Sequence, residues 1–192
     1  NDAATAKLFA ALGDFYVNDA FGSAHRAHAS TEGAARLLKP AVAGLLMEKE
    51  LEYLGRALAN PARPFVAVLG GAKISGKIDV IESLLPRVDH VLIGGAMACT
   101  FFRAKGVSTG ASLVEEDRIA MAKDLLERAG ARIVLPEGGV IAQSLEKPEP
   151  CREVAGNAVP AGWAMYDIDA TTRERFASIV KGAKTVVWNG PM

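Results

Sequence analysis

The stretch from residue 70 to residue 77, Gly-Gly-Ala-Lys-Ile-Ser-Gly-Lys, has the clearest chemical potential in the chain. It lies between an apolar run and a helical pattern. Glycines let a backbone approach a ligand closely, and the start of a helix offers unpaired N–H groups to an anion. Lys73 and Lys77 add positive charge. This combination predicts a phosphate-binding site.

Two other interpretations of this stretch stay open. The spacing from Gly71 to Gly76 and Lys77 matches a P-loop, but Ile78 stands where that motif has the Ser or Thr that binds Mg²⁺. The next apolar run ends in a glycine pair and not in the Asp that a P-loop protein needs for its metal. Alternatively, the glycines only form a tight turn and the lysines are solvated.

The glycine pair that ends this next run is Gly94 and Gly95. With the small residues that follow, it predicts a flat surface on which a planar ring could lie. Ordinary packing of a strand end against a helix explains the pair equally well. On its own, this segment does not decide between the two interpretations.

The polar loop 18–31 contains His25, Arg26 and His28. Arginine presents a planar fork of donors to carboxylate or phosphate, so the loop could hold an anion. The histidines could equally be bonded to the backbone. Two histidines without a third ligand nearby do not predict a metal site.

The composition narrows the class of protein. The 22 basic and 22 acidic residues cancel, so no charge excess points to nucleic acid or an anionic membrane. The apolar runs are far shorter than the roughly 20 residues that span a bilayer, and residues 1–5 carry no basic secretion signal. Cys99 and Cys151 have no disulfide or metal-binding spacing. We therefore expect a cytoplasmic protein without a metal site of its own.

The elements that must position these residues follow an alternating order. Apolar runs without polar alternation predict strands that are covered on both faces, at 65–69, 90–93, 131–135, 163–168 and 184–188. Amphipathic patterns predict helices at 75–85, 115–129 and 171–180, the last opened by a capping box from Thr171 to Glu174. This order predicts an α/β fold with a doubly wound parallel sheet, whose ligand site lies at the carboxyl ends of the strands.

The first 60 residues differ from this pattern. They predict a helix at 4–12, a strand at 15–17 and a long helix at 41–58, which ends before Pro61 and Pro64. One strand and one helix cannot fill a core, so these residues predict part of a second lobe. We expect a lobe remnant at 1–40, an interdomain helix at 41–60 and an incomplete domain at 61–192, in which 143–162 forms a long surface loop.

Four segments together resemble the phosphoglycerate kinase family, and the similarity extends over essentially all 192 residues. They begin at Asn18 (Asn-Asp-Ala-Phe-Gly-Ser-Ala-His-Arg-Ala-His-Ala-Ser), Gly70 (Gly-Gly-Ala-Lys-Ile-Ser-Gly-Lys-Ile), Ile93 (Ile-Gly-Gly-Ala-Met-Ala) and Val187 (Val-Trp-Asn-Gly-Pro-Met). The resemblance implies two Rossmann-like domains joined by a long helix, usually as a monomer. It implies the glycolytic reaction in which a phosphoryl group passes reversibly between ATP and 3-phosphoglycerate, giving ADP and 1,3-bisphosphoglycerate.

The resemblance also implies roles for single residues. Arg26 would bind the triose substrate, and Gly22 and His25 would shape its loop. Lys73 would follow the transferring phosphoryl group, and Lys77 would hold the nucleotide phosphates. The remaining nucleotide-binding residues would be Gly70, Gly71, Gly94, Gly95, Asn189 and Pro191, with Met165 and Tyr166 on the adenine side.

The chain departs from the family pattern in several places. Family members are about twice as long, as two complete domains require. Most of the basic triose site and the Asp that binds Mg²⁺ with the nucleotide are absent from these 192 residues. Residues 165–170 read Met-Tyr-Asp-Ile-Asp-Ala where the family usually has Gly-Leu-Asp-Ile-Gly-Pro, and Ala96 replaces a usual Gly. We therefore expect the chain alone to be inactive. The alternative is a non-catalytic nucleotide-binding or structural fragment.

Overall fold

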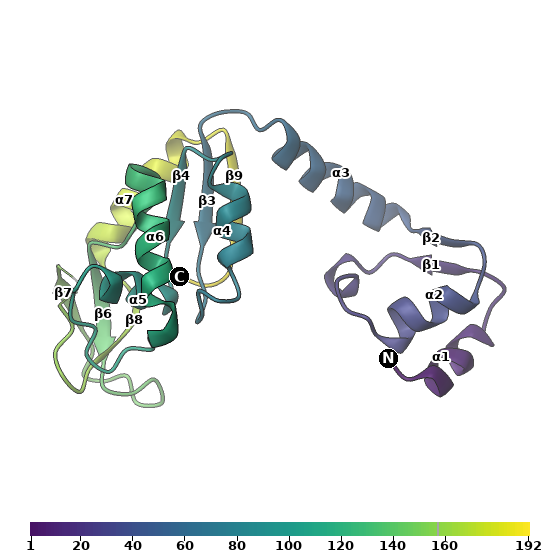
Figure 1. Cartoon of the computed structure of the whole chain (residues 1–192), viewed down its shortest axis with the longest axis horizontal. Helices are drawn as coiled ribbons and strands as arrows, with labels where there is room; N and C mark the ends of the chain where they lie inside the picture. Colours follow the sequence, from purple (N-terminus) through teal and green to yellow (C-terminus); the bar gives the residue numbers. More distant parts are fainter. Residues whose placement is uncertain (157) are drawn as a thin grey trace. The chain divides into compact units, whose positions relative to one another are not determined.

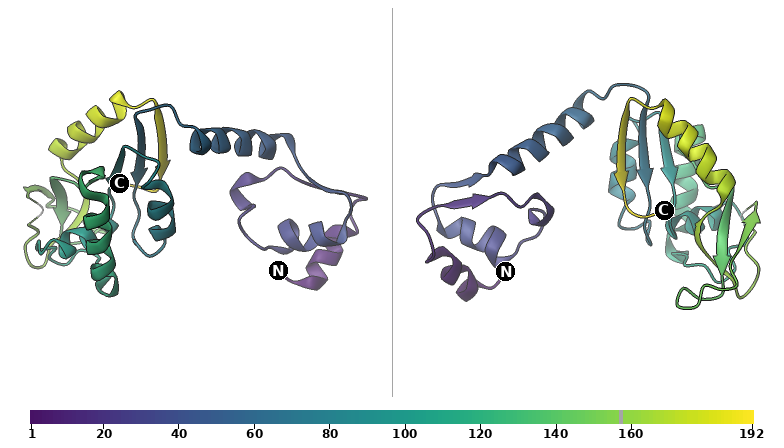
Figure 2. Two further views of the ribbon diagram at one scale, coloured as in Figure 1. Left: turned by 45° about the horizontal axis from the view of Figure 1, so that its top comes forward. Right: turned by 180° about the vertical axis from the view of Figure 1, so that it is seen from behind.

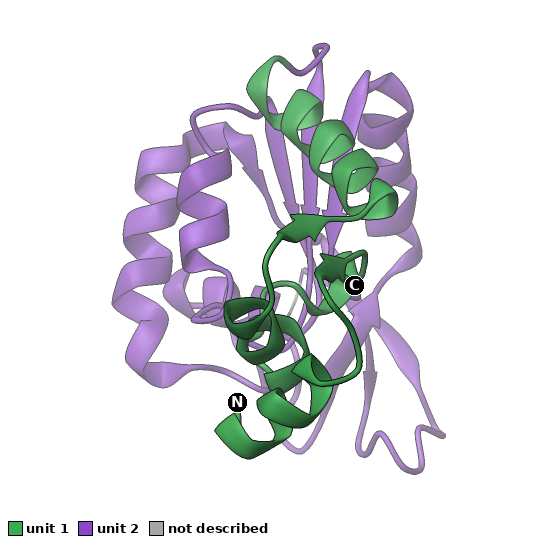
Figure 3. Cartoon of the chain, turned by 90° about the vertical axis from the view of Figure 1, so that its right-hand side faces the viewer, with its two compact units in different colours: residues 1–60 green, residues 61–192 purple. Residues whose placement is uncertain are grey.

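A computed structural model describes residues 1–156 and 158–192. The chain divides into two compact units, Asn1–Asn60 and Pro61–Met192, which are distinguished by colour in Figure 3. The division falls directly before Pro61, because a proline disfavours helical conformation in the residue that precedes it.

The first unit holds a small parallel sheet with helices around it (Figure 1). Strands β1 and β2 pair in parallel, with Tyr16 opposite Ala41. In chain order its elements are α1 (Ala3–Ala10), β1 (Tyr16–Asn18), the 3₁₀ turn η1 (Phe21–Ser23), the π-helical turn η2 (Ala29–Gly33), α2 (Ala34–Leu37), β2 (Ala41–Ala43) and α3 (Leu45–Ala59).

The long helix of the first unit is α3, and it begins at Leu45 and not at residue 41. The expected start is wrong because β2 occupies Ala41–Ala43 and pairs with β1. The carboxylate of Asp19 then accepts the backbone N–H of Met47 at 2.9 Å and satisfies a donor in the first helical turn. The first unit therefore has two strands where the sequence pattern predicted one.

The second unit contains the predicted parallel sheet, in the strand order β5-β4-β3-β9. This confirms the α/β fold class. Its elements are β3 (Phe65–Leu69), α4 (Ile78–Leu84), β4 (His90–Ile93), α5 (Met97–Ala104), η3 (Glu116–Arg118), α6 (Ile119–Ala129), η4 (Gly130–Arg132), β5 (Ile133–Val134), β6 (Gly138–Ala142), β7 (Arg152–Ala155), β8 (Ala164–Ile168), α7 (Ala170–Gly182) and β9 (Thr185–Asn189).

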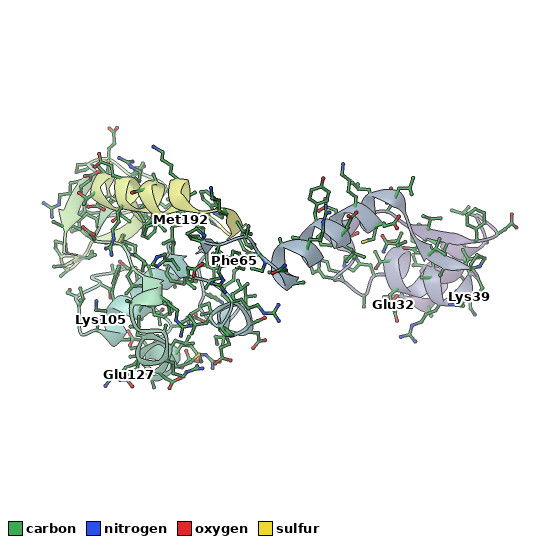
Figure 4. All side chains as sticks on the ribbon, turned by 90° about the horizontal axis from the view of Figure 1, so that it is seen from above. Glu32, Lys39, Phe65, Lys105, Glu127 and Met192 are labelled. Carbon is green, nitrogen blue, oxygen red and sulfur yellow. The ribbon has the colours of Figure 1, made fainter. Side chains whose placement is uncertain are left out.

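Burial in the parallel sheet is greatest at its centre. Every residue of β3 is buried, beginning with Phe65, which is labelled in Figure 4. Helix α7 lies along one face of the sheet (Figure 2), where its Phe176 belongs to the same buried cluster as Val68 and Leu92. Strand β9 forms an edge, and its Trp188 is 62% exposed, so the expected coverage of this strand on both faces is wrong.

The second unit also contains an antiparallel sheet that the sequence pattern did not predict. Strands β7, β6 and β8 form an antiparallel sheet in which β6 is central. The run 163–168 is therefore a strand, but its assignment to the parallel sheet is wrong. The expected loop 143–162 is also partly wrong, because β7 lies within it and pairs with β6. Antiparallel neighbours need no helical crossover, so the alternating pattern could not identify them.

Three predicted helix starts in the second unit also need correction. The side chain of Asp169 caps α7 by accepting the N–H of Thr172 at 3.0 Å, so the predicted capping box at Thr171 is wrong. Thr172 is buried, and its hydroxyl accepts the N–H of Glu137 at 2.9 Å, which ties this helix start to the second sheet. Helix α4 begins at Ile78, three residues later than predicted. Helix α6 begins at Ile119 and not at residue 115, because the 3₁₀ turn η3 precedes it.

Candidate functional site

The carboxyl ends of β4, β3 and β9 meet at one edge of the parallel sheet. In the strand register Leu69 lies opposite both Ile93 and Asn189. The residues that follow these three positions therefore emerge side by side. We call the segments 70–71, 94–95 and 189–191 the glycine edge.

Backbone hydrogen bonds hold the glycine edge together. The N–H of Gly70 donates to the carbonyl of Asn189 at 3.0 Å, and the N–H of Gly94 donates to Leu69 at 2.9 Å. The N–H of Met97 donates to the carbonyl of Gly71 at 3.0 Å and joins the first segment to helix α5. These bonds connect the three segments to one another at the carboxyl ends of the strands, where the sequence predicts a ligand site.

Glycine is required at two positions of this edge for different reasons. Gly95 has a φ of +65°, and a Cβ there would lie 2.5 Å from the backbone nitrogen of Gly71. At Gly70 a Cβ would overlap the carbonyl oxygen of Pro191. No side chain fits between these backbones, so the main chains of the segments pack directly against one another.

Lys77 brings a positive charge to the glycine edge. It is the N-cap residue of α4, and its ammonium contacts the side-chain oxygen of Asn189. A Cβ built on Gly71 would lie 3.9 Å from the Cε of Lys77, so the lysine side chain passes over this glycine. Helix α4 is short, with seven residues, so the ammonium of Lys77 and not the helix itself supplies the positive charge at the glycine edge.

Lys73 lies in the exposed part of the loop that precedes α4. Its neighbour Ile74 is completely buried and anchors this loop in the core. The electrostatic influence of Lys73 reaches the carboxylate of Glu115, a residue that the sequence pattern did not identify. Partial burial raises the pKa of Glu115, but the hydrogen bonds from Ser75 and the charge of Lys73 outweigh it and hold this pKa below its ordinary value.

Arg26, His25 and Gly22 lie together in the first unit. Gly22 is in η1, and the N–H of Arg26 donates to the carbonyl of Ser23 at 3.0 Å, which makes the segment compact. The Nε of Arg26 donates to the Nε2 of His25 at 3.3 Å. Both side chains are exposed, so the guanidinium is accessible to an anion.

Met165 and Tyr166 lie on β8, and the bonds that assemble the glycine edge do not involve this strand. Met165 is buried, and a Cβ on Gly139 would overlap its sulfur atom, so Gly139 makes room for it. Tyr166 is 41% exposed. The tyrosine ring is therefore the part of this pair that a ligand can reach.

A cavity of about 620 Å³ lies elsewhere in the second unit, between α6 and the end of β5. Lys105 and Glu127, labelled in Figure 4, are among its lining residues. The cavity contains no residue of the glycine edge. The glycine edge is the stronger candidate for the ligand site, because its positive charge and its glycines suit a phosphate group.

The described residues also bear on metals, cysteines and membranes. Among them, no three His, Cys, Asp or Glu side chains gather into a group that could hold a metal ion. Cys99 and Cys151 are free thiols, and burial raises the pKa of Cys99. None of the helices in the described ranges is long and apolar enough to cross a membrane.

Comparison with known proteins identifies the family. A family model described as phosphoglycerate kinase matches residues 1–192. The phosphoglycerate kinase of Moorella thermoacetica is 54% identical, with 100% of this chain and 49% of the relative covered. That of Solibacter usitatus is 56% identical with the same coverage. The chain thus spans about half the length of the curated relatives it matches.

Solved structures agree with these relatives. A phosphoglycerate kinase from Coxiella burnetii has a TM-score of 0.81 and 40% identity, covering 99% of this chain and 50% of its own. The enzyme from Pyrococcus horikoshii OT3 has a TM-score of 0.83 and 32% identity, covering 100% of this chain and 51% of its own. The chain therefore belongs to the phosphoglycerate kinase family.

Proposed function

We propose that the chain is a nucleotide-binding part of a phosphoglycerate kinase, which transfers a phosphoryl group reversibly between ATP and 3-phosphoglycerate. Transfer from ATP to 3-phosphoglycerate gives ADP and the acyl phosphate 1,3-bisphosphoglycerate. The observation that carries the proposal is the glycine edge, where three glycine-rich strand ends meet next to the ammonium of Lys77. A phosphate matches both features, because glycines let a ligand approach the backbone closely and the ammonium attracts an anion.

In this proposal Lys73 and Lys77 bind different phosphate groups of the nucleotide. Lys77 binds the phosphates that stay with the nucleotide, because its side chain already lies over the glycine edge. Lys73 follows the phosphoryl group that moves. Such a transfer develops charge on the equatorial oxygens and needs positioning and fixed cations more than a protein nucleophile. The exposed ring of Tyr166 takes the adenine side.

The triose substrate is assigned to the first unit. Arg26 would bind the carboxylate or phosphate of 3-phosphoglycerate through its planar guanidinium. His25 orients this guanidinium by accepting from its Nε, which leaves the terminal nitrogens to donate to the substrate. Gly22 contributes to the same turn.

Mg²⁺ enters this proposal with the nucleotide, where it would neutralise phosphate charge. Mg²⁺ that arrives with a nucleotide takes phosphate oxygens, water and only one or two carboxylates as ligands, so it needs no group of three donor side chains. The roles above are derived from lysine, arginine and backbone groups alone. We place the protein in the cytoplasm as a monomer with small molecules as its partners, in keeping with the reaction class.

The alternative is a fragment that binds nucleotide, or has a structural role, without catalysis. Calorimetric titration of the 192-residue chain with ADP tests the binding half of the proposal, and heat that saturates with one ADP per chain supports it. A coupled assay with MgATP and 3-phosphoglycerate tests the catalytic half. We expect no turnover from this chain alone, since transfer requires both reactants to be held in line at near-contact distance. Turnover within tenfold of a family member twice as long would contradict that expectation.

A further inference from the structure

A carboxylate from a distant part of the sequence holds the glycine-rich loop. Glu115 accepts the backbone N–H of Ser75 at 3.1 Å with one carboxylate oxygen. Its other oxygen accepts the hydroxyl of the same serine at 2.5 Å. The two residues are 40 positions apart in the chain. A single glutamate thus grips the residue that lies midway between the two lysines of the loop.

The backbone of Glu115 is fixed in turn. Its N–H donates to the hydroxyl of Thr100 at 3.2 Å, and Thr100 is 1% exposed on α5. Helix α5 directly follows the second glycine pair and receives the bond between Met97 and Gly71. Glu115 therefore joins the loop to the helix that continues from the neighbouring strand end, as a second tie beside that backbone bond.

The position of this carboxylate argues for a mechanical role. The N–H and hydroxyl of Ser75 already donate to Glu115, so neither is free to donate to a phosphate. A negative group next to Lys73 would repel phosphate if it faced the ligand. Because both carboxylate oxygens of Glu115 accept hydrogen bonds from Ser75, this charged group holds the loop in place.

We propose that Glu115 is a positioning residue, which holds residues 73–77 in the conformation that presents both lysines to the nucleotide phosphates. This inference rests on the proposed function, because it concerns the geometry of the same site. The carboxylate acts through Ser75 and does not itself contact the ligand. Its removal should therefore loosen the loop and leave the adenine side unchanged.

The test uses the 192-residue chain, three single variants and one double variant. Glu115→Gln removes the charge and one of the two acceptors, Ser75→Ala removes only the hydroxyl, and Glu116→Gln removes an equal charge from the exposed neighbour that faces Arg103. ADP and adenosine are titrated into each by calorimetry. Hydrogen exchange of the Ser75 amide is measured without ligand.

We expect Glu115→Gln to raise the Kd for ADP about tenfold, the scale of one charged hydrogen bond, and to leave the Kd for adenosine unchanged. Ser75 amide exchange should become faster in the same variant, and Glu116→Gln should match the unmodified chain in all three readings. The double variant of Glu115→Gln and Ser75→Ala should be no weaker than Glu115→Gln alone, because both remove one interaction.

Different results overturn different claims. If the unmodified chain binds no ADP, the proposed function fails, and this inference fails with it. If the unmodified chain binds ADP and Glu115→Gln binds it equally well, the inference alone fails. Equal losses for ADP and adenosine would also overturn it, because they would indicate general damage to the fold. Should Glu115→Gln not fold, an unchanged ADP affinity in Ser75→Ala would overturn the inference on its own.

Discussion

Replacement of Lys77 by alanine is the most direct perturbation of the proposed phosphate site. In the unliganded protein the ammonium of Lys77 contacts the side-chain oxygen of Asn189. A hydrogen bond from this ammonium to a phosphate oxygen would contribute about 1.5–3 kcal/mol, since one or both partners are charged. Releasing Asn189 offsets part of that gain, because the bond to Asn189 also has the charged ammonium as its donor. The net loss on truncation is therefore about 1–2 kcal/mol, which corresponds to roughly a 5- to 30-fold weaker ADP complex.

The assay for Lys77→Ala is calorimetric titration with ADP at constant ionic strength, because salt screens such contacts. The matched control is Lys123→Ala, which removes an equal charge from an exposed position on α6. The control should bind ADP as the unmodified chain does. Thermal unfolding of both variants checks that the fold survives. Identical ADP affinity in Lys77→Ala and the control would refute this argument and remove Lys77 from the site.

Three further predictions concern the fold and the division of roles. Gly95→Ala and Gly106→Ala both place an alanine at a positive φ, at about 1–2 kcal/mol each, but of the two only Gly95 has backbone in the way of the new Cβ. Urea unfolding should therefore show Gly95→Ala to be less stable by roughly 1 kcal/mol more, and equal losses would contradict the close approach. The N–H of Phe65 holds the pKa of Asp89 below its ordinary 3.8, so the stability it adds is present above that pH and is lost on acidification below it. Asp89→Asn should flatten this acid limb of an unfolding-versus-pH series, and an unchanged slope would be evidence against it. Arg26→Ala should leave the Kd for ADP unchanged by calorimetry, and in a longer family member it should raise the KM for 3-phosphoglycerate; selective loss of ADP binding would contradict the assignment.

The parallel sheet could be predicted because its strands carry a strong local signal. Strand β3 is apolar throughout and buried throughout, which is typical of strands covered by helices on both faces. Strands β6 and β7 of the antiparallel sheet carry no such signal, whereas β8 was predicted as a strand. Strand β6 begins with Gly138 and Gly139, residues that disfavour strands, and β7 begins with the polar pair Arg152 and Glu153. Their pairing with each other decides their structure.

Some residues of the candidate site could be predicted from the sequence, and others could not. The glycine edge was predictable, because its residues follow recognisable strands and share short, glycine-rich spacing. Glu115 was not, since its partner lies 40 positions away and a lone glutamate before a helix is normally a solvated residue. Asp169 was missed because Thr171 offered a competing cap with the same local appearance, and only the contact with Thr172 distinguishes them.

The central claim is that the glycine edge binds the phosphates of an adenine nucleotide. Its most direct test is a titration of the isotope-labelled 192-residue chain with ADP, followed through backbone amide resonances. The account predicts that the largest shifts fall in residues 70–77, 94–95 and 189–190, whereas residues around the cavity near Lys105 and Glu127 stay unchanged. Saturable shifts confined to that cavity, or no shifts at the glycine edge at saturating ADP, would contradict it.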